Sequence, residues 1–543
     1  MDPLMIGAVL LFVLGLLVLG VVPMPDWATS FLASDFWGSW GELSDHYGIG
    51  RAFQDARPWI GWAMILLAVW SLRRVLLWPL RHAYWIRRVF GGRIFGDARW
   101  ARPRDLKQEA MLQQGGLFLG SLRGRDFFHN GEGHLLTIGG VGGGKSSGLV
   151  VPTLISLTEG SVIVTDPSGE LAAMTARRRA EIGPVVFLNP FAEIFSADTG
   201  LHFEDSGFNP FSTLDPKSSV FFSQCSAFAR LLMVNDRRES GSYFNDEGAE
   251  FLYLMIASIK LYDDADLHNL PFLFSVVRDS PKNIQQRLQW IMDEGHPAIR
   301  DDAQRYFSMI EDAKPQWTGV SSKAALATKR YAPTTPLGVH TEKNGFDAAR
   351  LKTENVTVYI LVPSSMLADA LPWLNMLTGV FGAAIGKPGP RSPVTMLIDE
   401  APALGYLPDL RGHMAQFRKV GLRVWLFTQT YAAMAGQELY GDTGMKEIMG
   451  LVTIKQFFAV EEPEVQKMVS ELCGMRSMSN PSSTGSTGDV GQPLIRPDEV
   501  RGLRKWSQII IRGGLHFPIK AKLVPYFSRP EWRAQVDANP YRK

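Results

Sequence analysis

The sequence predicts an α/β fold in which a doubly wound sheet carries a P-loop and is interrupted by an all-helical stretch. Three observations lead to this prediction. Short apolar runs bounded by turn residues recur from about residue 105 onward, as expected for parallel strands that helices cover on both faces. A glycine-rich loop separates one of these runs from a helix-compatible segment. Residues 217–350 show helical patterns without a convincing strand.

Two apolar segments precede this region. Residues 4–22 are uncharged and almost wholly apolar, so as a helix they are long enough to cross the hydrocarbon core of a bilayer. A cleaved signal peptide is disfavoured, because no basic residue precedes the apolar run. Residues 58–78 form a second, more interrupted apolar segment with several tryptophans, for which a buried soluble helix is the alternative.

The charge flanking these segments predicts their orientation. Residues 23–57 carry five acids and two arginines, whereas residues 73–104 carry nine arginines and one acid. Because arginine-rich flanks stay in the cytoplasm, we expect a short periplasmic loop at 23–57 and a large cytoplasmic body after residue 73.

Composition excludes two classes of protein. The chain has 543 residues with 56 Lys+Arg and 54 Asp+Glu, a net charge of +2, so its surface is not a uniformly basic nucleic-acid coat. Cys225 and Cys473 are the only cysteines and lie far apart. Neither a disulfide framework nor a zinc site is therefore predicted.

Seven apolar runs are expected to form the sheet. They are the segments 134–139, 161–166, 185–189, 356–363, 394–399, 423–430 and 507–513. The chain then divides into a membrane anchor at 1–104, a nucleotide-binding domain in two parts at 105–216 and 351–543, and an all-α insertion at 217–350. Residues 477–493 are rich in Ser, Gly, Thr and Pro and are expected to form a mobile loop.

The glycine-rich loop has the spacing of a P-loop, GxxxxGKS, and stands between the run HLLTI and the segment SGLVVPTLISL. Glycines let successive backbone N–H groups approach phosphates. We expect Lys145 to contact the β- and γ-phosphates and the Ser146 hydroxyl to contact a magnesium ion. The residues predicted to bind ATP are Gly139, Gly140, Val141, Gly142, Gly143, Gly144, Lys145, Ser146 and Ser147. The alternative is a glycine-rich turn that matches by chance.

A second apolar run, VTMLIDE, ends in two carboxylates. Asp399 is expected to hold the magnesium ion through its water shell, and Glu400 to orient or deprotonate the attacking water. Gln429 ends the later run LFTQT, where a γ-phosphate sensor would be useful. The alternative for these polar residues is an ordinary solvated turn.

Three arginines, Arg411, Arg418 and Arg423, lie between the Asp-Glu run and Gln429. One of them could act as an arginine finger that stabilises charge on the nucleotide of a neighbouring subunit. Solvated charges on a helix face are the alternative.

Several motifs occur together and in order along the chain. They are FGDARWA (95–101), the P-loop, SVIVTDPSGEL (161–171), LIDEAPALGYLP (397–408), LFTQT (426–430), PLIRPDEV (493–500) and IIIRGG (509–514). In this order they resemble the type IV secretion system coupling proteins, or TraG/TraD-like conjugative ATPases, from about Gly96 to the C-terminus. Separated motifs in the family order are far more specific than a P-loop alone.

The resemblance implies a RecA-like motor with an inserted all-α domain, preceded by two transmembrane helices, that uses ATP and Mg²⁺ as a homohexamer at the bacterial inner membrane. Such proteins pass relaxase-bound single-stranded DNA or a secreted protein to the other subunits of the secretion system. Carried over by position, Lys145 belongs to the Walker A motif and Asp399 and Glu400 form the Walker B pair. Gln429 matches the glutamine sensor, and Arg418 falls where related proteins place the arginine that acts in trans.

The sequence departs from the family pattern at two places. Val141 and Gly142 stand where a Pro/Ala-Thr pair is common, and Ser168 stands where many members carry lysine. Two other functions therefore stay open: a double-stranded DNA translocase of the FtsK/HerA kind, and a non-hydrolysing membrane scaffold whose nucleotide site controls assembly. No C-terminal winged helix is apparent for the first, and the intact Asp399-Glu400 pair argues against the second.

Overall fold

The computed structural model describes residues 59, 62–63, 65–68, 96–233, 243–387, 389, 392–481 and 487–541. The predicted span at 4–22, the loop at 23–57 and most of the span at 58–78 lie outside the described residues. Among the residues that are described, no helix combines the length and apolar character needed to cross a membrane. The sheet and the helices discussed next belong to one compact unit, Ala98–Arg476 with Pro493–Lys543.

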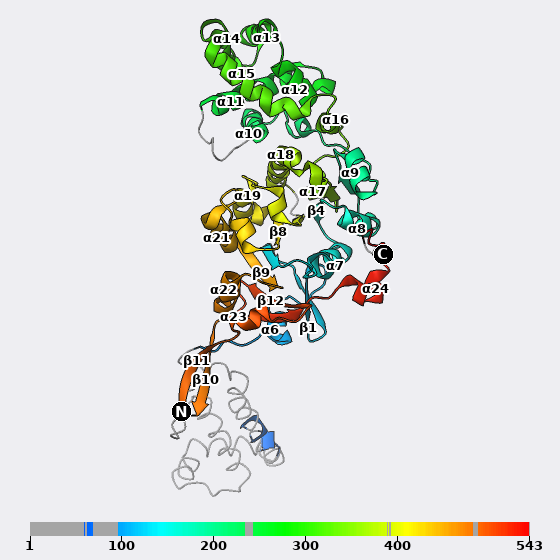
Figure 1. The fold of residues 1–543 in the computed structure, drawn as a ribbon, viewed down its shortest axis with the longest axis vertical. Coiled ribbons are helices and arrows are strands. Elements are labelled where there is room, and N and C mark those ends of the chain that lie inside the picture. Colours follow the sequence, from blue (N-terminus) through cyan, green and yellow to red (C-terminus); the bar gives the residue numbers. More distant parts are fainter. Residues whose placement is uncertain are drawn as a thin grey trace, which may run out of the picture. The chain divides into compact units, whose positions relative to one another are not determined.

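In the described part of this unit, eleven strands form one sheet (Figure 1). Their spatial order is β2 (Arg125–His129), β1 (Leu117–Leu122), β13 (Ile519–Lys522), β12 (Ser507–Arg512), β9 (Val452–Phe458), β3 (His134–Gly139), β8 (Leu422–Thr428), β7 (Val394–Ile398), β4 (Ser161–Thr165), β6 (Thr357–Ile360) and β5 (Val185–Leu188). The strands from β9 to β5 run parallel to one another, whereas β12, β13, β1 and β2 extend the sheet as antiparallel strands.

All seven predicted runs are strands, but the prediction of a parallel strand at 507–513 is wrong. This run is β12, which pairs antiparallel with both β9 and β13. An apolar run reports burial on both faces and not strand direction, so the two cases look alike in sequence. The sequence reading also missed β1, β2, β9 and β13, whose apolar residues are interrupted by polar side chains such as Lys455 and Gln456 of β9.

Helices cover both faces of the parallel part of the sheet. On β3, Leu135 packs into the hydrophobic cluster that includes α7 (Val151–Ser156) and α8 (Glu170–Ala180). Its neighbours Leu136 and Ile138 point to the opposite cluster, which includes residues of α18 (Leu367–Gly386) and α19 (Leu410–Phe417). Because successive side chains of a strand alternate between faces, a strand buried on both sides must be apolar throughout.

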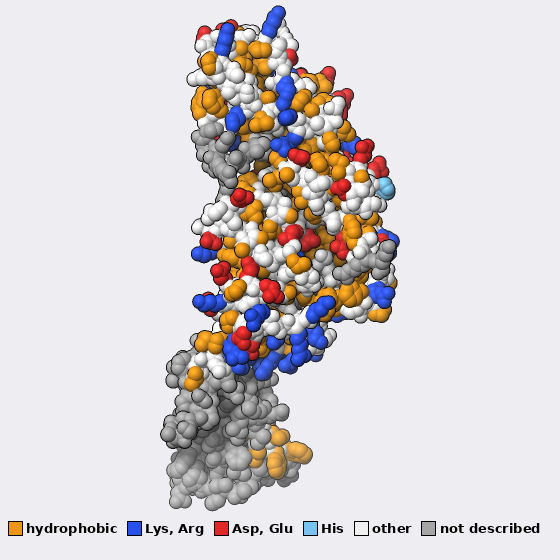
Figure 2. Space-filling model, in the orientation of Figure 1, with side chains coloured by type: hydrophobic (Ala, Val, Ile, Leu, Met, Phe, Trp, Pro, Cys, Tyr) orange, Lys and Arg blue, Asp and Glu red, His pale blue; other side chains and the backbone are white. Residues whose placement is uncertain are grey.

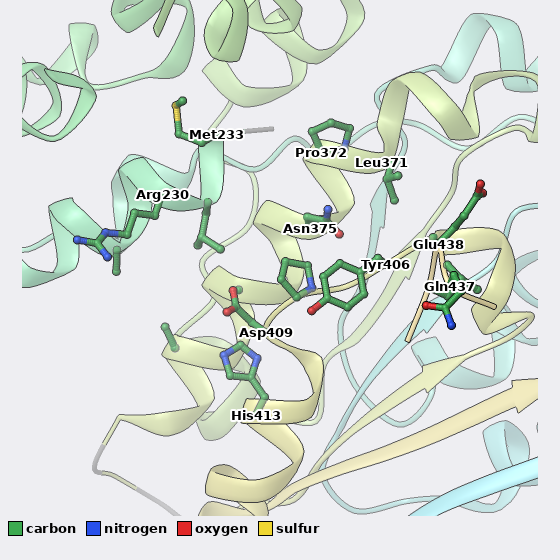
Figure 3. A pocket seen from close by; sticks show the side chains of 17 residues that line it. Arg230, Met233, Leu371, Pro372, Asn375, Tyr406, Asp409, His413, Gln437 and Glu438 are labelled. Atoms are coloured by element: carbon green, nitrogen blue, oxygen red, sulfur yellow. The ribbon is translucent and has the colours of Figure 1, made fainter. Parts of the chain in front are cut away.

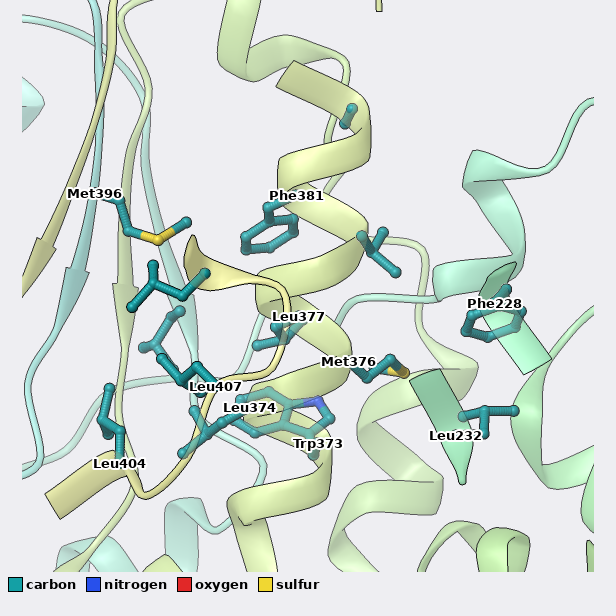
Figure 4. Close-up of a cluster of buried hydrophobic side chains, with 14 of the residues drawn as sticks. Phe228, Leu232, Trp373, Leu374, Met376, Leu377, Phe381, Met396, Leu404 and Leu407 are labelled. Carbon is teal, nitrogen blue, oxygen red and sulfur yellow. The ribbon is translucent and has the colours of Figure 1, made fainter. Parts of the chain in front are cut away.

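Helix α18 (Leu367–Gly386) lies between the sheet and the helical region (Figure 4). Leu377 and Phe381 lie on the side of Met396 of β7, and Met376 faces Phe228 on α10 (Phe221–Leu232). Helix α19 (Leu410–Phe417) packs beside β8. A largely apolar α18 is thus the element that connects the core of the sheet to the core of the helices.

Between β5 and β6 the described residues contain helices and no strand. They are α9 (Ala192–Thr199), α10 (Phe221–Leu232), α11 (Tyr243–Tyr262), α12 (Leu270–Val277), α13 (Pro281–Glu294), α14 (Pro297–Asp312), α15 (Lys314–Thr328), α16 (Pro336–Glu342) and α17 (Arg350–Thr353). Proline occupies the first or second position of α12 to α16, where its fixed φ suits a helix and its missing N–H costs nothing. The side chains of Asn269, Ser280 and Thr335 cap three of these helices.

The prediction of a mobile loop at 477–493 is wrong for most of that segment. Strands β10 (Met475–Pro481) and β11 (Thr487–Pro493) pair as a two-stranded sheet. Hairpin pairing uses backbone N–H and C=O groups, so a Ser- and Gly-rich composition does not exclude it.

Candidate nucleotide-binding site

The P-loop follows β3 directly, and its glycines are required by the space around them. Gly142 and Gly144 have φ of +67° and +93°, a region that residues with side chains rarely adopt. A Cβ atom at Gly140 would lie 2.3 Å from the carbonyl oxygen of Ala459, and one at Gly144 would lie 2.3 Å from the ring of Trp506. The loop is therefore a cradle of bare backbone.

A helix begins at the end of this cradle. Ser146–Val150 has π-helical hydrogen bonding and continues into α7, with Pro152 at the second position of α7. Because Pro152 has no N–H to donate, regular α-helical bonding is interrupted there. Ser146 and Ser147 at the start of this helix share one cavity lining with the glycines of the loop, and the N-terminus of a helix favours an anion.

A cavity of about 270 Å³ lies over the loop and the start of this helix. Seven of the nine predicted ATP-binding residues line it: Gly140, Gly142, Gly143, Gly144, Lys145, Ser146 and Ser147. The other two do not. Gly139 is the buried last residue of β3, and Val141 projects into solvent with 84% of its surface exposed.

Three predicted site residues meet beside the loop. The Lys145 ammonium donates a hydrogen bond to the Gly139 carbonyl at 2.9 Å, and it lies 3.6 Å from a carboxylate oxygen of Glu400. The Gln429 amide donates to the same Glu400 oxygen at 2.9 Å. The strand order explains this meeting, because β8 lies between β3 and β7 and all three strands are parallel.

Glu400 reaches this position through an unusual backbone conformation. Its φ of +55° and ψ of +61° are left-handed, which costs a residue with a side chain about 1 kcal/mol or more. The Glu400 carbonyl accepts a hydrogen bond from Ala403 N at 2.9 Å, so the conformation is held by the following turn. The turn directs the carboxylate toward Lys145 and Gln429 instead of along the strand.

Two further carboxyl groups end neighbouring strands. Asp399 follows β7, and burial raises its pKa to about 6, while the Lys145 ammonium acts in the opposite direction. Asp166 follows β4 and is 2% exposed. Burial raises the pKa of Asp166 to about 7, with a smaller contribution from the charge of Asp399. Carboxyl groups whose ionised form is disfavoured in this way are suited to a site that a cation completes.

The three candidate arginines have different surroundings. Arg423 lies on β8 with 5% of its surface exposed and donates to Thr395 Oγ1 at 2.9 Å, so it is wrong as an arginine-finger candidate. Arg411 forms an ion pair with Glu447. Arg418 is exposed at the end of α19, and its side chain forms no hydrogen bond or ion pair with the residues that the structure describes.

Sequence reasoning missed several residues around the loop. The cavity is also lined by Glu170, Met174, Lys505, Trp506, Tyr526, Phe527 and Asn539. Asp166 carried a signal, since it ends an apolar run just as Asp399 does. The aromatic residues carried no such signal in the sequence, because they come from turns near the end of the chain that no local motif connects to the P-loop.

A larger cavity of about 1030 Å³ lies away from the P-loop (Figure 3). Its wall includes Arg230 of α10, Asn375 of α18, and Tyr406, Asp409 and His413 from the segment after β7. None of the predicted site residues lines it. The candidate nucleotide site is therefore chosen by the chemistry of its residues and not by cavity size.

Charged side chains of both signs are mixed over most of the face in Figure 2. Lys and Arg gather near α6 (Pro103–Gln108) and β1. Strand β13, next to β1, adds the exposed Lys520 and Lys522. Basic charge on this face is thus local and not uniform.

A glycine cradle follows a strand of a parallel sheet, and a lysine, acidic strand ends and a glutamine lie beside it. These features define the class of P-loop proteins with a RecA-like α/β fold. Within this class, residues 99–541 match the family model described as type IV secretory system conjugative DNA transfer. The chain belongs to this family, which confirms the resemblance inferred from the motifs.

Similar proteins of known name support this family assignment. The type IV secretion system-coupling protein VirD4 of Bartonella henselae is 24% identical over 75% of this chain. This chain spans 65% of the length of that relative. The solved structure of the conjugative coupling protein TrwBdeltaN70 has a TM-score of 0.60 at 16% identity and covers 79% of this chain and 94% of its own. TrwB in complex with ADP and Mg²⁺ has a TM-score of 0.58 at 15% identity, with coverages of 79% and 94%.

Proposed function

We propose that the chain is the coupling ATPase of a type IV secretion or conjugation system. The observation that carries this proposal is the meeting of Lys145, Glu400 and Gln429 beside the glycine cradle, in a chain of the conjugative DNA transfer family. A lysine within ion-pair distance of a carboxylate, and a glutamine amide that donates to the same carboxylate, are the groups needed to bind a nucleoside triphosphate and position a water.

Each residue has a distinct task in the proposed hydrolysis. The N–H groups of the cradle bind the phosphates, and Lys145 exchanges its contact with Glu400 for the β- and γ-phosphates. Glu400 then orients the attacking water and accepts its proton, and Gln429 holds the Glu400 carboxylate in place. Lys145 and Gln429 thereby link the state of the γ-phosphate to the position of the general base.

The donor set suits a magnesium ion. The Ser146 hydroxyl lines the cavity over the loop, and Asp399 is close enough to Lys145 for the charge of the ammonium to act on its carboxyl, so both can offer oxygen atoms, the donors that Mg²⁺ prefers. When bound, Mg²⁺ neutralises charge on the phosphate oxygens. Its positive charge would also favour the ionised form of Asp399, whose pKa burial raises.

We further propose the assembly and cargo that go with this activity. The chain forms a homohexamer at the bacterial inner membrane, anchored by two helices at 4–22 and 58–78, with the nucleotide-binding domain at 105–216 and 351–543. It passes relaxase-bound single-stranded DNA, a secreted protein or both to the other secretion subunits. The all-α insertion at 217–350 contacts the cargo, and Arg418 completes a neighbour's site. Family membership supports these assignments.

The decisive experiment measures ATP turnover and transfer with Glu400→Gln. We expect turnover to fall on the order of 10²–10³-fold while ATP still binds, because the variant lacks only the proton acceptor. Lys145→Ala should lose both binding and transfer. Glu193→Gln, an exposed residue in the first turn of α9, is the matched control and should behave as wild type.

Other outcomes would select other functions. Transfer that survives Glu400→Gln and Lys145→Ala contradicts a coupling ATPase. Nucleotide binding without turnover in the wild-type chain favours the scaffold whose nucleotide site only controls assembly. Turnover stimulated by double-stranded DNA alone, without effect on secretion, favours a translocase of the FtsK/HerA kind.

A further inference from the structure

An aromatic wall closes one side of the nucleotide cavity. Trp506 stands in the turn before β12, and Tyr526 and Phe527 follow β13. All three line the cavity, which Glu170 and Met174 of α8 also line. The Trp506 and Phe527 ring centroids are 6.0 Å apart, and those of Tyr526 and Phe527 are 5.4 Å apart. These edge-to-face contacts hold the three rings together as one surface.

Trp506 touches the P-loop itself. The six-membered part of its indole ring lies where a Cβ of Gly144 would stand, and within 3.8 Å of a Cβ placed on Gly148. On its other side, the Trp506 ring lies next to Phe527. The phosphate cradle and the aromatic wall therefore form one continuous site.

The backbone of Trp506 is strained in a way that favours a functional role. Its φ is +65°, in a turn that Ser507 N closes by donating to Arg504 O at 2.9 Å. The Trp506 carbonyl accepts from Leu523 N at 2.9 Å, which fixes the turn against the end of β13. Glycine would occupy such a turn without strain, whereas tryptophan adopts this backbone conformation at a cost in free energy.

We propose that the base of the bound nucleotide stacks on this aromatic wall, with Trp506 as its principal contact. This inference rests on the proposed nucleotide-binding function. Once the phosphates occupy the cradle, the base must lie in the rest of the same cavity, whose lining includes the three rings directly beside the cradle. The planar face of a base gains most from an aromatic surface, and polar lining groups such as Asn539, which donates to Glu170, are already engaged.

The alternative is that the aromatic wall only supports the P-loop and does not contact the base. Measuring the binding of two probes to the full-length chain distinguishes a base contact from structural support. ATP has a base, whereas inorganic tripolyphosphate offers the cradle only phosphates. For Trp506→Ala we expect ATP affinity to fall about tenfold to a hundredfold, with tripolyphosphate affinity nearly unchanged. Trp506→Phe should restore most of the loss for ATP. Equal losses for both probes would overturn the base contact.

Two further variants keep the result unambiguous. Trp290→Ala removes a 44% exposed tryptophan of α13 and should leave both affinities at the wild-type value. If Trp506→Ala does not fold, Phe527→Ala tests the same wall and should also weaken ATP more than tripolyphosphate. A wild-type chain that binds neither probe would refute the nucleotide site itself, and a chain that binds ATP equally with and without the wall would refute only this inference.

Discussion

At the scale of single residues, this site depends on backbone positions that only particular side chains tolerate. Gly144 combines a φ of +93° with direct contact to Trp506, so it meets both a conformational and a steric requirement. Glu400 accepts a left-handed conformation in order to reach Lys145. Strain of this kind is concentrated where groups must meet for chemistry.

Gly144→Ala should therefore lose nucleotide binding and also lower the free energy of unfolding by about 1–3 kcal/mol. Gly412→Ala is the matched control, because Gly412 lies within α19 and an added Cβ there meets no heavy atom within 4 Å. That control should bind normally and be stabilised by up to about 1 kcal/mol. Nucleotide titration and urea denaturation of both variants measure these effects, and normal binding by Gly144→Ala would contradict the cradle geometry.

His129 is a second residue whose surroundings have a measurable consequence. It is 4% exposed, and its Nε2 pairs with the Gly133 carbonyl at 3.0 Å. Burial, with smaller contributions from the nearby cations Arg423 and Arg512, lowers the pKa of His129 to about 4, although the contact with the Gly133 carbonyl acts in the opposite direction. The folded protein therefore keeps this ring neutral at a pH where the unfolded chain binds a proton.

Stability contributed by His129 is present above pH 6.5 and is lost as the pH falls toward 4. Between pH 7 and pH 5 we expect a loss on the order of 2 kcal/mol from this group. In His129→Gln the free energy of unfolding, measured by urea denaturation, should fall by less over the same interval. An identical fall in both proteins would show that His129 does not titrate as its burial requires.

At the scale of elements, a chain of buried polar side chains joins the two halves of the sheet. Thr137 on β3 donates to Gln456 Oε1 on β9 at 2.8 Å, and Gln456 Nε2 donates to Gln508 Oε1 on β12 at 3.0 Å. Gln508 in turn donates to the Leu119 carbonyl on β1 at 2.6 Å. These contacts connect parallel and antiparallel strands, and Thr137, Gln456 and Gln508 are fully buried.

Because every member of this chain is buried, removing one leaves its neighbours unpaired. Gln456→Leu should cost about 1–3 kcal/mol for each polar group left without a partner, and Gln508→Leu should behave similarly. The double variant should cost less than the sum of the two, since the groups that pair with each other are then both absent. Additive losses in urea denaturation would show that the two glutamines do not act as a unit.

At the scale of the whole molecule, no arginine is among the described residues that line the cavity over the P-loop. Arg423 is buried within the sheet and Arg411 is paired with Glu447, whereas Arg418 is exposed and has no hydrogen-bond or ion-pair partner among the described residues. A cation that projects from the surface is suited to act on a neighbouring subunit. This is the basis for proposing Arg418 as the trans arginine of a ring.

A mixing experiment tests that role. Arg418→Ala should lower ATP turnover on the order of 10³-fold, and Lys145→Ala should also be inactive. When the two variants are mixed, some sites combine an intact P-loop with an intact Arg418 from the neighbour, so turnover should reappear. A mixture as inactive as its components would contradict action in trans, and Arg411→Ala serves as the control arginine.

Local patterns predicted the P-loop, the Asp399-Glu400 pair and the central strands, because each depends on a few consecutive residues. A glycine spacing between a strand and a helix carries its own geometry. The apolar runs reported burial correctly, yet they did not distinguish the antiparallel β12 from its parallel neighbours, and they missed strands whose polar residues form the Gln456 network. Pairing direction depends on which strand lies alongside, and this is not a local property.

What the sequence determined by itself is the α/β fold class, the family and the position of the glycine-rich loop, since short motifs in a fixed order along the chain encode them. The tertiary structure alone brought Asp166 near Asp399, buried Arg423 and set Trp506 against Gly144. Trp506 lies more than three hundred residues after Gly144 in the chain. Such contacts arise from the order of the strands in the sheet. That order depends on burying the apolar side chains of both faces of the sheet at once, which is a property of the whole molecule.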